Sequence, residues 1–104
     1  MIKNFTPHPI NILDAKNKNI ATIESCGQIR LAASTIPAGN HEGIALTKTV
    51  FGDPEGLLGF EAGTLLIVSQ LVKSALPERT DLVVPAEVVR DEKGRIIGCR
   101  SLGV

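Results

Sequence analysis

The stretch that decides the fold is residues 81–100, DLVVPAEVVRDEKGRIIGCR, because it reads as two apolar strands joined by a tight turn. Residues 91–93 suit a type I turn, and Gly94 can adopt the positive φ of the bulge residue that completes it. We therefore expect a β-hairpin over residues 86–102. The expected pairs are Asp91 with Arg95, Arg90 with Ile96, Val89 with Ile97, Val88 with Gly98 and Glu87 with Cys99. Apolar residues then fall on both faces, which predicts that other elements cover the middle of the hairpin.

Residues 64–84, immediately before the hairpin, predict a β-α-β unit. A continuous apolar run over residues 64–68 is typical of a buried strand, and Ser69 is a favourable N-cap for a helix of about two turns. The helix has an apolar stripe and ends at Pro77; the stripe consists of Leu71, Val72, Ala75 and Leu76. A crossover of about a dozen residues is the minimum for parallel pairing with residues 81–84. The alternative is one longer helix from residue 64 to 76, where neither glycine nor proline interrupts the chain.

The first half of the sequence predicts short strands and loops. Strands are expected over residues 8–13 and 20–24, joined by a polar turn, and over residues 28–33 and 44–51. Turn-forming residues predict a loop over 35–43, and four glycines predict an exposed loop over 52–63. The whole chain, residues 1–104, is thus expected to be a single α+β domain with mostly short β-strands in a mixed sheet and one short helix.

Composition excludes several classes of function. Eleven basic and eleven acidic residues cancel, and only three aromatic side chains are present, so we expect no nucleic-acid binding. No apolar run is long enough to span a bilayer, so we expect no membrane partner. Cys26 and Cys99 are expected to be free thiols in a reducing cytoplasm. Together with His8 and His41 they lack metal-ligand spacing, and no P-loop occurs, so we expect no metal or cofactor.

The N-terminal segment supplies the first candidate site. His8 lies between Pro7 and Pro9, which favour extended backbone and present the imidazole on a stiff segment, with Thr6 close by. A titratable group held in one orientation suits ligand binding. The alternative interpretation is that Thr6 and Pro7 only start a strand and that His8 is a half-exposed edge residue.

A second candidate is the junction between strand and helix at Ser69 and Gln70. Parallel strands of α/β units commonly bind ligands at their carboxyl ends, where Pro85 would also lie. The start of the helix attracts anions. The alternative is that Ser69 is a cap and nothing more.

Two arginines of the hairpin are the third candidate. In the expected register Arg90 and Arg100 share one face and lie roughly 13 Å apart, which suits an extended anion or two separate salt bridges. Arg95 should instead form a surface pair with Asp91 worth well under about 1 kcal/mol.

The residues at 4–10 and 84–100, with 63–69 between them, resemble a group of small uncharacterised proteins encoded by bacteria and their phages. The resemblance implies a bacterial host cell as the location and favours a binding module, such as a phage protein that sequesters a nucleotide-derived defence signal. The residues themselves predict non-enzymatic binding of a small anionic molecule by Thr6, His8, Ser69, Gln70, Pro85, Arg90 and Arg100.

Two alternatives stay open. One is a small hydrolase or transferase with His8 as general acid or base and Cys99 or Ser69 as nucleophile. The other is a protein-interaction or phage accessory module with exposed strands. One short helix leaves much of the sheet uncovered, so we also expect a homo-oligomer, most simply a dimer.

Overall fold

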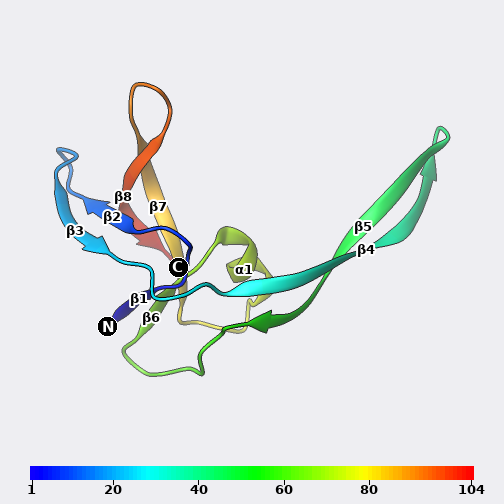
Figure 1. The fold of residues 1–104 in the computed structure, drawn as a ribbon, viewed down its shortest axis with the longest axis horizontal. Coiled ribbons are helices and arrows are strands. Elements are labelled where there is room, and N and C mark those ends of the chain that lie inside the picture. Colours follow the sequence, from blue (N-terminus) through cyan, green and yellow to red (C-terminus); the bar gives the residue numbers. More distant parts are fainter.

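The computed structural model describes residues 1–104 as an α+β fold with a six-stranded mixed sheet, one short helix and a separate two-stranded ribbon (Figure 1). The sheet has the strand order β1-β6-β7-β8-β2-β3, in which β7–β8 and β2–β3 are antiparallel and the other neighbours are parallel. The elements are β1 (Ile2–Asn4), β2 (Ile10–Leu13), β3 (Asn19–Ile23), β4 (Arg30–His41), β5 (Ile44–Glu55), β6 (Leu65–Ile67), α1 (Gln70–Ala75), β7 (Leu82–Arg90) and β8 (Ile96–Gly103).

The predicted β-α-β unit is confirmed. Strands β6 and β7 pair in parallel, and α1 connects them. Ser69 caps the helix, because its Oγ accepts a hydrogen bond from the Val72 N–H at 3.3 Å, and the helix ends before Pro77. The alternative of one longer helix from residue 64 is therefore wrong. Strand β1, which the sequence pattern did not reveal, adds a short parallel edge beside β6.

The core forms around this unit. Its buried members are Phe5, Ile29, Leu66, Val68, Val72 and Leu82. Phe5 is therefore not available for stacking on a ligand. The helix contributes only Val72 as a fully buried side chain, while Leu71, expected in the apolar stripe, is 53 % exposed. Six helical residues give less than two full turns, so the buried face is narrower than the sequence pattern suggested.

The C-terminal hairpin is confirmed, but the predicted register is wrong by one residue beyond the Arg90–Ile96 pair. Gly94 has a φ of 80°, and Arg90 pairs with Ile96, as expected. Val89 then pairs with Gly98 instead of Ile97, because a bulge leaves Ile97 as an extra residue on β8. The expected cover over the hairpin is also missing: Ile96 is 60 % exposed and Ile97 40 %.

The largest difference between the predicted and the observed fold concerns residues 35–55. Instead of a loop over 35–43, β4 and β5 form one continuous antiparallel ribbon, here called the arm, which projects from the body (Figure 1). Glu42 and Gly43, with φ values of 51° and 80°, close it by a two-residue turn. Pro37 is tolerated because a two-stranded ribbon has two free edges. The expected loop at 52–63 begins only after Glu55.

A bidentate ion pair fixes the loop before β7. Arg79 Nε donates to Asp81 Oδ1 at 2.9 Å, and Arg79 Nη2 donates to Asp81 Oδ2 at 2.7 Å and to the Leu58 carbonyl at 2.9 Å. The hydrogen bonds from Arg79 lower the pKa of the Asp81 carboxyl and raise the pKa of the guanidinium. The pair thus ties residue 58 to the start of β7.

Candidate functional site

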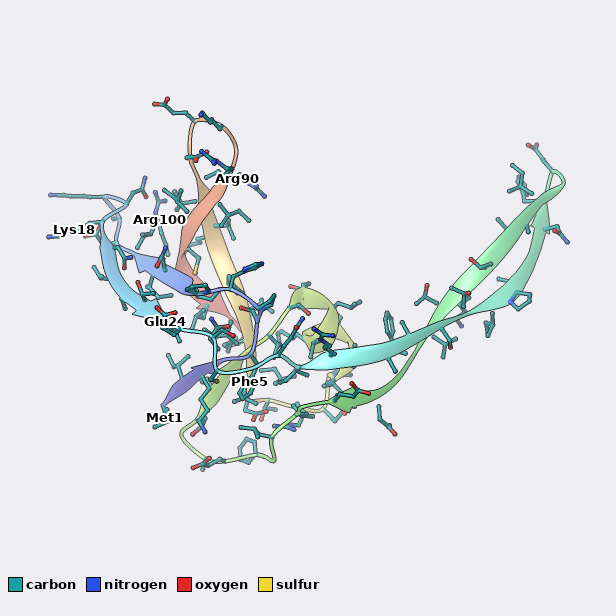
Figure 2. All side chains as sticks on the ribbon, in the orientation of Figure 1. Met1, Phe5, Lys18, Glu24, Arg90 and Arg100 are labelled. Carbon is teal, nitrogen blue, oxygen red and sulfur yellow. The ribbon has the colours of Figure 1, made fainter.

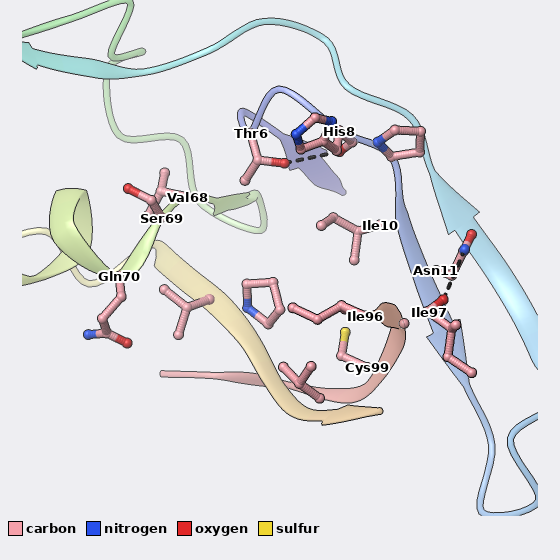
Figure 3. A pocket seen from close by; sticks show the side chains of 15 residues that line it. Thr6, His8, Ile10, Asn11, Val68, Ser69, Gln70, Ile96, Ile97 and Cys99 are labelled. Carbon is pink, nitrogen blue, oxygen red and sulfur yellow. Dashed lines mark hydrogen bonds between the residues drawn. The ribbon is translucent and has the colours of Figure 1, made fainter. Parts of the chain in front are cut away.

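A pocket of about 460 Å³ opens where four segments meet: the residues before β2, the junction of β6 and α1, the middle of β7, and β8 (Figure 3). Five of the seven candidate ligand-binding residues line it, namely Thr6, His8, Ser69, Gln70 and Pro85. These residues come from distant parts of the sequence. The parallel β6–β7 pair brings Ser69 and Pro85 together, and the pairing of β2 with β8 brings His8 to the same place.

The walls of the pocket are mostly apolar. Val68 and Cys99, 0 % and 1 % exposed, lie deepest. The remaining apolar wall comprises Pro9, Ile10, Val84, Pro85, Val88, Ile96 and Ile97. Ligand pockets of this kind combine apolar walls with a few polar groups that orient the ligand. The exposed hairpin residues thus become the outer wall of the pocket.

A buried asparagine holds the segment that carries His8. Asn4 is 0 % exposed, and its Nδ2 donates to the carbonyls of His8 at 2.7 Å and Ile23 at 2.9 Å. Its Oδ1 accepts hydrogen bonds from the Thr6 N–H at 2.9 Å and from the Thr6 hydroxyl at 2.6 Å. Both N–H groups and both oxygen lone pairs of this amide are thus used within the protein. Asn4 therefore fixes the turn at residues 6–8 without lining the pocket.

The polar groups of the pocket differ in what they still offer a ligand. The Thr6 hydroxyl hydrogen lies between Asn4 Oδ1 and the His8 carbonyl, so Thr6 presents only an acceptor. Ser69 Oγ accepts from the Val72 N–H and keeps its hydroxyl hydrogen for another partner. Gln70 Nε2 donates to Ser74 Oγ at 3.2 Å, which leaves its carbonyl oxygen and second N–H free. The His8 side chain is exposed, and it is the one ionisable group in the pocket lining besides the buried Cys99 thiol.

Asn11 is a further polar residue of the lining, which the sequence pattern did not single out. Its Nδ2 donates to the Ile97 carbonyl at 3.2 Å, and its Oδ1 accepts from the Thr22 hydroxyl at 2.9 Å. Asn11 thus links β2 to the bulge of β8.

The sequence did carry a signal for the role of Asn4. Asparagine side chains commonly form a hydrogen bond to the backbone two residues further on, and Thr6 lies at that position.

Arg90 and Arg100 do not line the pocket. Arg90 lies near the tip of the β7–β8 hairpin (Figure 2), where its Nη1 donates to the Gly94 carbonyl at 2.9 Å. Arg100 Nη2 donates to Asn17 Oδ1 at 2.6 Å, in the turn between β2 and β3. The expectation that both arginines share one face is wrong, because the extra residue at Ile97 reverses the face of every residue after it. The expected pair of Arg95 with Asp91 is present at 3.4 Å.

Cys99 is the deepest potential nucleophile of the pocket. Burial raises the pKa of its thiol above the usual value, because the charged thiolate loses hydration there. Cys26 is exposed, and both cysteines are free, as expected. A thiol whose charged form is disfavoured is a poor nucleophile, since the thiolate is the reactive species.

Comparison with known proteins adds no assignment: the sequence matches no protein-family profile and no curated protein, and the fold matches no solved structure. The helix α1, with its six residues, is far too short to cross a membrane. The resemblance to bacterial and phage proteins and the cytoplasmic location stay predictions.

Proposed function

We propose that the chain binds a small nucleotide-like molecule in the pocket without converting it. The observation that carries the proposal is the pocket itself: about 460 Å³, an apolar interior, and free polar groups of His8, Ser69 and Gln70 in its lining. Pockets of about 300–1,000 Å³ with mostly apolar walls and a few polar groups are typical of small-molecule sites. A planar base would pack against the apolar walls, and the polar part of the ligand would meet these three side chains.

The anionic part of such a ligand would rely on a different set of contacts from those expected from the sequence. Because Arg90 and Arg100 are engaged elsewhere, the groups near the pocket that can donate to an anion are the His8 imidazole, the Ser69 hydroxyl and the Gln70 amide. These donors would offer hydrogen bonds to an oxyanion without a strong net positive field. The proposal therefore favours ligands with a modest negative charge over polyphosphates.

Binding without chemistry is favoured over hydrolysis or transfer. Cys99 has a raised pKa, and the Ser69 hydroxyl makes no hydrogen bond to a general base, since its partner is the backbone N–H of Val72. Nucleophilic catalysis by serine needs an adjacent base within about 2.6–3.2 Å. His8 alone supplies an acid or a base but no activated nucleophile.

The test is a thermal-shift screen against mononucleotides, cyclic nucleotides and ADP-ribose-like compounds, followed by titration calorimetry and mass spectrometry of each mixture. We expect a stabilising ligand to be recovered unchanged. His8→Ala should weaken its binding about tenfold or more, because a charge-assisted hydrogen bond contributes about 1.5–3 kcal/mol.

Two matched controls sharpen this test. His41→Ala removes the other histidine of the chain, which lies in the arm and outside the pocket, so affinity should not change. Gln70→Ala should weaken binding, whereas Ser74→Ala, which breaks the same Gln70–Ser74 hydrogen bond outside the pocket, should not. Converted ligand would support the enzyme instead, and equal effects of both histidine variants would refute this pocket as the site.

We also propose that the chain forms a homo-oligomer, most simply a dimer. Only 14 of its 104 residues are buried, and several large apolar side chains are exposed along the arm and the hairpin. Monomeric proteins rarely expose large contiguous apolar patches.

A further inference from the structure

The exposed large aliphatic side chains of the arm lie on one face, with Lys48 among them. Successive residues of a strand point to opposite faces, so Ile44, Leu46 and Val50 of β5 share one face with Ile36 of β4, which pairs with Lys48. We call these four residues the arm stripe. The opposite face carries Thr47 and Thr49 in the middle of the same strand, followed by Phe51, which is 38 % exposed. This alternation is typical of a strand that is buried on one side.

Nothing within the chain covers the arm stripe. Its side chains are between 40 % and 67 % exposed, namely Ile36 46 %, Ile44 67 %, Leu46 43 % and Val50 40 %. The side chains of the outer arm project into solvent on both sides (Figure 2). An isolated two-stranded ribbon is marginally stable in water at best, and this one continues over 12 residues in each strand. The arm therefore needs a surface to pack against.

The solvent-accessible area of the chain is larger than that of a compact monomer of the same mass. The chain exposes 7144 Å², whereas a compact monomer of 11.0 kDa exposes about 5,600 Å², an excess of about 1,500 Å². Its radius of gyration is 16.9 Å, against about 13 Å for a compact chain of this length. Permanent homodimers bury about 2,000–5,000 Å² in total, or about 1,000–2,500 Å² per subunit. The excess thus falls within the range that one subunit of such a dimer would bury.

The charge of the arm also suits a copy of itself. Residues 30–55 contain two basic residues, Arg30 and Lys48, and three acidic ones, Glu42, Asp53 and Glu55. A nearly neutral surface does not repel its own copy, and it lacks the strong charge that would select a nucleic acid or an anionic membrane.

We infer that the arm is the dimerisation element of this protein: its apolar stripe, Ile36, Ile44, Leu46 and Val50, packs against a second copy of the chain. Two-fold symmetry makes the contact reciprocal, so each subunit covers the arm of its partner. The inference does not depend on the pocket, because none of the stripe residues lines it.

The test compares two double variants of one strand by light scattering coupled to gel filtration, without any ligand. Leu46→Glu with Val50→Glu places two charges on the stripe, on either side of Lys48, which limits repulsion between them. Thr47→Glu with Thr49→Glu places the same charges on the opposite face of β5. At about 20 μM we expect twice the 11.0 kDa chain mass for the wild type and the threonine variant, and a dissociation constant at least 100-fold weaker for the stripe variant.

Hydrogen exchange of the wild type gives a second readout that needs no variant. Amides of residues 33–36 and 45–50 should lose protection when the protein is diluted below its dissociation constant, whereas those of β6 and β7 should not. A wild type that is monomeric at 100 μM would overturn the inference. Equal behaviour of the two double variants, whether both dimeric or both monomeric, would also overturn it, because the stripe would then have no special role.

Discussion

Replacing Asn4 by alanine should be among the most destabilising single changes in this chain. The side chain is completely buried, and its amide makes three hydrogen bonds to backbone groups besides the one from the Thr6 hydroxyl: to the carbonyls of His8 and Ile23 and from the Thr6 N–H, at 2.7–2.9 Å. Each such bond contributes about 1 kcal/mol net, and its backbone partner loses this bond when the side chain is removed. We therefore expect Asn4→Ala to lower the free energy of unfolding by about 3 kcal/mol.

Urea unfolding at neutral pH measures this loss. With a denaturant slope of about 1–1.5 kcal/mol/M for a chain of this size, 3 kcal/mol moves the midpoint by about 2–3 M. Asn19→Ala is the matched control, because Asn19 is exposed and bonds only to nearby residues, Ala21 and Thr22. That variant should lose no more than about 0.5 kcal/mol. A loss below about 1 kcal/mol in Asn4→Ala, or one equal to the control, would refute the argued role of the buried amide.

Two further predictions concern ionisable groups. Asp81→Asn should lower the free energy of unfolding by about 2–3 kcal/mol at pH 7, because it leaves Arg79, 17 % exposed, without its carboxylate. The pKa of Asp81 in the folded protein lies below its usual 3.8, so the ion pair stabilises the fold fully above pH 3.8. The difference in unfolding free energy between wild type and Asp81→Asn should therefore shrink as the pH falls below 3.8, and a difference that stays constant would contradict this. A thiol reagent at pH 8 should label Cys26 rapidly and Cys99 only after unfolding, and rapid labelling of both in the native state would refute the burial of Cys99.

The parts of the fold that the sequence predicted correctly are those with strong local signals. A continuous apolar run, the Ser69 cap and Pro77 each indicate the same β-α-β unit, so the boundaries of β6 and α1 lie within a residue or two of the prediction. The pocket followed from this unit, because the end of β6 and the middle of β7 are adjacent wherever the two strands pair in parallel. Burial of Asn4 was not predictable in this way, since its partners Ile23 and His8 meet only in the folded sheet.

The sequence pattern did not predict the arm, because it contains residue types that are common in turns but lie within a strand here. Pro37, Gly39 and Asn40 are common in loops, and their presence outweighed the alternation of Ile44, Leu46 and Val50. In the structure a bulge between Pro37 and Asn40 accommodates them, and the actual turn uses Glu42 and Gly43. Glu-Gly is a weaker turn signal than Asn-Gly, because glutamate adopts positive φ less readily.

The predicted orientation of Arg100 was wrong for a physical reason that the sequence pattern does not reveal. Ile96 and Ile97 are equally apolar, so the pattern reads the same whether or not one of them is an extra residue. Gly98 decides between the two registers, because a Cβ there would lie 2.8 Å from the Asn11 carbonyl oxygen, so only glycine lets β2 approach this closely. Gly98 thus pairs with Val89, and Ile97 is the extra residue between Gly98 and the Arg90–Ile96 pair next to the turn. Cys99 then faces the pocket, and Arg100 faces away from it.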